Sequence, residues 1–151
     1  MKRKAHYSLT HTQIKTFRAS SGARQVSIDN AFLGPIPEEI LIAFVKNTAF
    51  VGSASTNQFH FHHYDMSNLV LFVNGVKNPS EPLTIERSST FGASRAYETH
   101  ISSTGVHHDD RAYMVTLEMF TKNFCLLGFD LTPDREADEE HINYLVKEMC
   151  V

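Results

Sequence analysis

Apolar residues in this chain are gathered in short segments separated by Ser, Thr, Asn, Gly and Pro. Mainly apolar runs at residues 39–45, 69–73 and 124–131 have the length and flanking turn residues typical of β-strands, although a buried helical turn is an alternative for the first. Residues 25–32 and 58–64 alternate apolar and polar positions, which is the period of a half-buried strand. The pattern therefore predicts an all-β chain of short strands joined by long polar loops.

One strand run ends in a clear turn signal. Asn74-Gly75 follows residues 69–73, and this pair favours a type I′ hairpin turn because both central residues need a positive φ. Pro79 and Pro82 interrupt the segment after the turn, so the return strand is expected to be short or to lie at a sheet edge. Residues 94–101 could form one or two helical turns, and residues 111–122 are ambiguous.

The chain contains no repeat and no heptad pattern, and its 151 residues correspond to one domain. Short strands between long loops predict a jelly-roll β-sandwich with short helical turns in the loops. We expect a basic N-terminal arm at residues 1–23, the jelly-roll domain at 24–134 and an acidic-to-apolar tail at 135–151. The polar loops at residues 88–110 leave open a ligand-binding module as an alternative.

Charge and hydropathy exclude several classes of partner. Fourteen Lys+Arg against seventeen Asp+Glu give a net charge of −3, which disfavours a dedicated nucleic-acid binder. The arm has no acidic residue before Asp29, so it could touch nucleic acid weakly or simply be a loose terminus. No apolar run approaches the roughly 20 residues that span a membrane. The basic start lacks the apolar stretch of a signal peptide, so cytoplasm or nucleus is expected.

Nine histidines make a metal site worth considering. On a strand, His60 and His62 would share one face and His63 would point the other way; His107, His108, Asp109 and Asp110 could add ligands for zinc, iron or manganese. This arrangement would suit a cupin-like metal enzyme. The alternative is that a half-buried strand tolerates His on its solvent face, and the prediction adopted is that no residue binds metal.

Other catalytic chemistry is not indicated. There is no Gly-x-Ser-x-Gly motif or Gly-rich phosphate loop, and the adjacent pairs Glu38-Glu39 and Glu139-Glu140 are typical of a solvated surface. Cys125 lies in an apolar run and Cys150 is the penultimate residue, so both are expected to be reduced. The residues therefore predict a non-enzymatic protein without a cofactor.

The most distinctive segment is FCLLGFDLTPD at residues 124–134. It resembles a segment containing Phe-Asp-Leu-Thr-Pro-Asp in the major capsid proteins of Polinton (Maverick) elements and adintoviruses. Upstream, residues 58–61 with 69–75 resemble that family's Pro-Phe-x-Phe block, strand and Val-Asn-Gly turn. Still earlier, residues 37–45 resemble its strand ending in aromatic-Val. The blocks occur in the family's order and together cover about residues 20–134.

The resemblance implies part of a double jelly roll, corresponding to its second, C-terminal barrel. Such proteins trimerise into capsomers of an icosahedral shell, are not enzymes and need no cofactor. It therefore implies a homo-oligomeric structural protein of a virion-like assembly, encoded by an integrated element. The family continues with a Gly-x-Val-Arg strand and a Tyr-Ala-Glu strand, which residues 135–151 do not match. We therefore expect an incomplete barrel, as from a truncated or rearranged gene copy.

Overall fold

The computed structural model describes residues 11–85, 90–104, 113–132 and 149–150. Within these residues the chain is β-rich, with one sheet of four strands in the order β1-β6-β2-β5 and a separate two-stranded sheet. The longest ladder of the larger sheet joins antiparallel β2 and β5, with β5 at the edge, and β6 pairs in parallel with both β1 and β2. Its strands are β1 (Phe17–Arg18), β2 (Glu39–Val45), β5 (Leu126–Asp130) and β6 (Met149–Cys150).

The two-stranded sheet is the hairpin that the sequence predicts. Strands β3 (Leu69–Val73) and β4 (Val76–Leu83) pair antiparallel around Asn74 and Gly75, whose φ angles are 51° and 82°. Both values are positive, as the type I′ turn requires. The return strand is eight residues long despite its two prolines, so it is not short. Among the described residues it pairs only with β3, in agreement with the alternative of an edge position.

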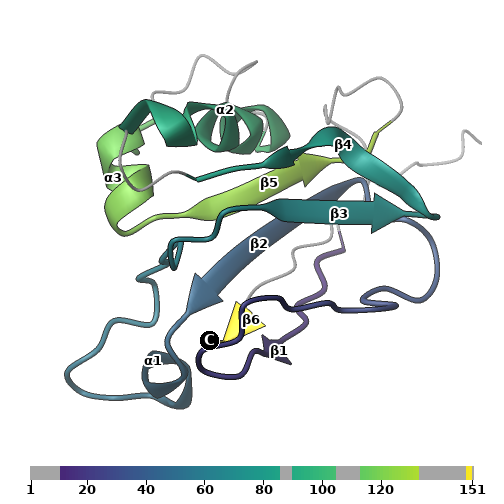
Figure 1. The fold of residues 1–151 in the computed structure, drawn as a ribbon. Helices are drawn as coiled ribbons and strands as arrows, with labels where there is room; N and C mark the ends of the chain where they lie inside the picture. Colours follow the sequence, from purple (N-terminus) through teal and green to yellow (C-terminus); the bar gives the residue numbers. More distant parts are fainter. Residues whose placement is uncertain (1–10, 86–89, 105–112, 133–148, 151) are drawn as a thin grey trace, which may run out of the picture.

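Short helices flank the larger sheet on two sides (Figure 1). The α-helices are α1 (Asn47–Val51), α2 (Ser94–Ser103) and α3 (Leu117–Lys122), and a 3-10 turn, η1 (Thr90–Ala93), leads into α2. Helix α2 runs along β5 with α3 beside it, whereas α1 lies with β1 and β6 at the other end of β2. Gly128 of β5 permits this close approach, since a Cβ there would lie 1.7 Å from Ser103 Oγ. A helix layer therefore covers β5, within the stretch where the sequence predicts only helical turns.

The core lies between β2, β5, the hairpin and the two helices. Several side chains from these strands and helices are fully buried in it. Burying one large apolar side chain stabilises the fold by about 1.5–3 kcal/mol relative to leaving it exposed. The predicted strand at residues 39–45 is confirmed, and most of its side chains are buried or half-buried on both faces. The largest buried contributors are Phe44, Leu83, Phe120, Leu127 and Phe129.

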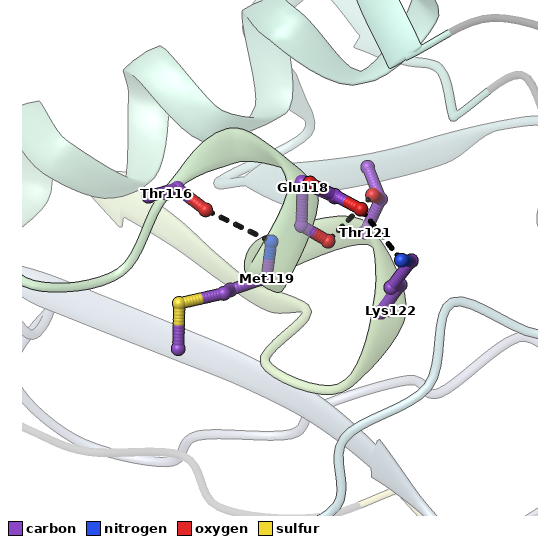
Figure 2. A network of polar contacts seen from close by, with 5 residues as sticks. All are labelled: Thr116, Glu118, Met119, Thr121 and Lys122. Carbon is purple, nitrogen blue, oxygen red and sulfur yellow. Dashed lines mark hydrogen bonds and ion pairs between the residues drawn. The ribbon is translucent and has the colours of Figure 1, made fainter.

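Helix α3 begins and ends with local polar contacts (Figure 2). The Thr116 hydroxyl caps the helix by accepting a hydrogen bond from Met119 N–H at 3.2 Å. One turn later, Lys122 Nζ contacts Glu118 Oε1 at 2.6 Å, the favourable i,i+4 order of acid before base. Thr121 donates to the Glu118 carbonyl at 3.0 Å. The last six residues of the stretch 111–122, which was ambiguous from the sequence, therefore form a helix.

Two predicted strands are wrong. Residues 25–32 form turns and coil, because Asn30 adopts a left-handed φ of 53° and Val26 remains 41% exposed. Residues 58–64 form one isolated bridge, between Phe61 and Phe124, instead of a strand. Alternation alone does not make a strand where no neighbouring strand supplies a continuous ladder.

The predicted domain limits do not coincide with the limits of the sheet. Strand β1 lies within the segment assigned to a basic arm, and β6 lies within the segment assigned to a tail. Next to β1, Lys15 Nζ donates to the Ala31 carbonyl at 2.6 Å and lies over the Phe32 ring. Across the described stretches, no helix is both long enough and apolar enough to cross a membrane.

Candidate functional site

The two histidines singled out by the sequence line the same surface cavity. This cavity, of about 240 Å³, lies between the start of α1 and the segment that precedes the Phe61 bridge. Two backbone hydrogen bonds hold the segment that carries the histidines. Phe61 N–H donates to the Asn123 carbonyl at 2.9 Å, and His62 N–H donates to the Phe44 carbonyl at 3.0 Å. The histidines are therefore held by a segment anchored to both β2 and the residues before β5.

The His60 and His62 rings lie edge to face, with centroids 6.1 Å apart. The Tyr64 ring continues this row, at 5.7 Å from His62. Partial burial lowers the pKa of His62, and the positive charges of Lys46, His60 and His63 lower it further. The cavity thus gathers cationic and potentially cationic groups, and none of the residues that line it is acidic.

Polar groups complete the cavity wall. Thr56 Oγ1 is buried and has no hydrogen-bond partner, which is unusual because buried hydroxyls are normally paired. Asn57 Oδ1 accepts from Phe59 N–H at 2.9 Å and the Asn57 carbonyl accepts from His60 N–H at 3.3 Å, so this turn is internally braced. Ser55 contributes a further hydroxyl to the lining.

The structure brings together only part of the predicted metal-ligand set. His60 and His62 are neighbours, but His63 Nδ1 is occupied by the N–H of Asp65, which donates to it at 3.0 Å. Residues 107–110 lie outside the described residues. Within the described part of the chain, no group of three His, Cys, Asp or Glu residues could hold a metal ion. The cupin-like metal site stays an untested prediction.

A second histidine site escaped the sequence prediction. His100 lies on the buried face of α2, only 3% exposed, where its Nε2 hydrogen-bonds to the Tyr113 hydroxyl. Its ring packs against Phe120 with centroids 5.8 Å apart, and its Nδ1 is buried without a hydrogen-bond partner. Burial lowers the pKa of His100 to about 4. The spacing of Ala96, His100 and Ser103 would have marked this helix face.

Two carboxylates lie opposite each other at the end of the β2–β5 ladder, contrary to the prediction that Glu39 belongs to a solvated surface. Glu39 and Asp130 are directly opposed in the β2–β5 register. Burial raises the pKa of Glu39 to about 7, and the negative charge of Asp130 adds to the shift. Asp130 Oδ1 accepts from the backbone N–H and the hydroxyl of Thr132, at 2.8 Å and 2.6 Å. The Asp130 carboxylate therefore stabilises the turn at which β5 ends, close to the end of the strand that the sequence predicts.

Cys125 is a free, fully buried thiol, as the apolar run predicts. Burial raises the pKa of this thiol to about 12, so no thiolate forms at neutral pH. The cysteine is consequently a packing residue and not a nucleophile. For Cys150 the structure describes only the backbone, as part of β6.

Comparison with known proteins gives one distant relative. The chain is 19% identical over 146 residues to a Caenorhabditis elegans protein described as "Uncharacterized protein F54H12.2". The match covers 96% of this chain and 34% of that protein, so the chain spans about a third of the length of the curated relative it matches. No family model and no solved structure matches the sequence.

Proposed function

We propose that this chain is a non-enzymatic structural protein of the capsid type, derived from a virus-like element, that acts by associating with copies of itself. Support comes from the ordered resemblance of residues 20–134 to the capsid proteins of Polinton elements and adintoviruses, and from the β-rich architecture. The jelly-roll arrangement and the trimeric state of that family are part of this proposal, as is its place in a virion-like assembly.

The outer face of the β3–β4 hairpin is the observation that carries the proposal. Leu69 and Leu71 pack against the core, so Val70 and Phe72 of the same strand face outward. Phe72 is 59% exposed, whereas Val76, which is 70% exposed, is opposed to Val73 and so lies on the other face of the hairpin. An antiparallel sheet with one solvated face normally carries polar residues there. Large apolar side chains in this position favour contact with another protein surface.

The edge of the same hairpin argues for contact through this face. Pro79 and Pro82 lie within β4, where they remove two backbone N–H donors. Prolines and short irregular edges discourage the addition of a further strand. Copies of the chain are therefore expected to associate by packing the apolar faces of their hairpins and not by extending the sheet.

The test is the molar mass of the purified chain by size-exclusion chromatography with light scattering. Wild-type protein should form a trimer or a larger discrete oligomer. Phe72→Lys should give a monomer with an unchanged far-UV circular dichroism spectrum, because the charge opposes burial of the outer face and this side chain does not pack in the core.

A matched control places the same charge elsewhere. Met114 is 84% exposed and lies outside the hairpin, so Met114→Lys should leave the oligomer intact. A wild-type protein that stays monomeric at its highest soluble concentration would contradict the proposal. So would an oligomer that both variants preserve, because the contact would then lie elsewhere.

A further inference from the structure

The cavity beside His60 and His62 has the chemistry of an anion site. Lys46, His60 and His62, which line the cavity, carry positive or protonatable nitrogen atoms. No acidic residue lines the cavity to neutralise them. We propose that this cavity binds a small tetrahedral oxyanion, a phosphate group above all. The inference is independent of the proposed structural role.

The local field favours an anion over a metal cation. Partial burial is the largest cause of the lowered pKa of His62, and the charge of Lys46 adds to it by opposing protonation of the ring. A divalent cation placed between the two rings would meet the same repulsion from Lys46, more strongly because its charge is larger. An oxyanion in that place would instead be attracted by Lys46 and would favour protonation of both imidazoles.

The donors match an oxyanion in kind. Lysine and histidine N–H groups form short, charge-assisted hydrogen bonds to phosphate oxygens. The cavity, at about 240 Å³, is below the range of about 300–1,000 Å³ that is usual for larger organic ligands. A phosphate group with part of its water shell is therefore the better match.

The experiment is a titration of the ¹⁵N-labelled full chain with sodium sulfate at constant ionic strength, followed by amide chemical shifts. Sulfate is the first probe because its charge stays constant over the range in which histidine titrates. Shifts should concentrate at residues 46–62, and affinity should be higher at about pH 6 than at about pH 8. The charged groups around His62 are Lys46, His60 and His63, with Asp65 beside His63, so protonation of the imidazoles should dominate this change.

Variants assign the binding to the cavity. Lys46→Met should weaken sulfate binding about tenfold, because it removes the lysine charge from the cavity wall. His60→Gln with His62→Gln should abolish the pH dependence while leaving weak binding through Lys46. Lys77→Met removes an exposed lysine of β4, away from the cavity, and should bind as wild type does.

Further titrations separate the possible sources of the anion. Inorganic phosphate and a nucleoside monophosphate should shift the same amides, and tighter binding of the second would indicate a phosphate ester as the ligand. Equal weakening by Lys46→Met and Lys77→Met would overturn the proposal, because the attraction would then be a diffuse surface effect. Zinc binding at the two histidines that sulfate cannot displace would overturn it in favour of a metal site.

Discussion

His100 places a titratable ring in the apolar core beneath α2. It hydrogen-bonds to Tyr113 through one nitrogen and leaves the other buried and unpaired, so the ring is tolerated only in its neutral form. The unfolded chain takes up a proton near pH 6.5, whereas burial lowers the pKa in the folded chain to about 4. The stability that neutral His100 provides is therefore complete above about pH 6.5 and is lost as the pH falls toward 4.

Replacing the His100 ring should weaken the dependence of the free energy of unfolding on pH in acid. His100→Gln should reduce the free energy of unfolding at pH 7, because it loses the packing against Phe120. Between about pH 6.5 and 4, however, it should lack the further loss on the order of 2–3 kcal/mol that wild type shows. Urea denaturation across this range measures both effects. Met114→Gln, at an exposed position without a titratable group, is the control and should keep the wild-type slope; a wild-type slope in His100→Gln would refute the assignment.

Sequence reasoning found some of these residues and missed others for identifiable reasons. His60 and His62 were visible because they are close in sequence, although the predicted strand is wrong. Lys46 lies between β2 and α1, and the bond from His62 N–H to the Phe44 carbonyl holds the histidine segment beside it. Glu39 resembles a surface residue until its cross-strand partner is known, because Asp130 lies far along the chain. Pairing across the sheet is the information that a local pattern lacks.

At the scale of elements, continuous apolar runs were better guides than alternation. The strands β2, β3 and β5 arise from such runs, which can bury side chains whatever their neighbours are. Alternating segments depend on a partner strand, and residues 25–32 and 58–64 have no continuous ladder within the described residues. The packing of α2 on β5 was not predictable from either pattern, because it depends on one small residue, Gly128, opposite Ser103.

Gly128→Ala tests this contact between helix and strand. The new Cβ would lie 2.8 Å from Ser103 Cβ as well as 1.7 Å from its Oγ, so rotating the hydroxyl cannot relieve the clash. Overpacking of this kind should cost about 2–3 kcal/mol in the free energy of unfolding. Ser103→Gly removes both clashing atoms, so Gly128→Ala should cost roughly 1 kcal/mol less in that background, which is the size of a contact coupling energy. Equal costs in both backgrounds would show that the helix does not press on this glycine.

At the scale of the whole molecule, two buried groups give stability opposite dependences on pH. Glu39 has a folded-state pKa of about 7 against an ordinary value of 4.5, so the folded chain holds this proton longer than the unfolded chain. Its contribution is complete below about pH 4.5 and is lost as the pH rises through 7. His100 acts in the reverse sense over an overlapping window. The two slopes partly cancel in mildly acidic solution, where wild-type stability should change little.

Glu39→Gln should expose this cancellation. The amide cannot ionise, so the variant avoids burying a charge opposite Asp130 and should be more stable than wild type at about pH 8, on the order of 1–2 kcal/mol after allowance for partial solvent exposure. At about pH 4 the two proteins should be equally stable, because wild-type Glu39 is then protonated. In the variant, the free energy of unfolding should consequently depend on pH through His100 alone, and it should fall more steeply in acid than in wild type.

Glu118→Gln is the matched control: Lys122 lowers the pKa of that exposed carboxylate, so its loss brings no gain in stability at high pH. Chemical denaturation of the three proteins at both pH values is the measurement, and a Glu39→Gln protein no more stable than wild type at pH 8 would show that the carboxylates at the end of β2 and β5 are solvated after all.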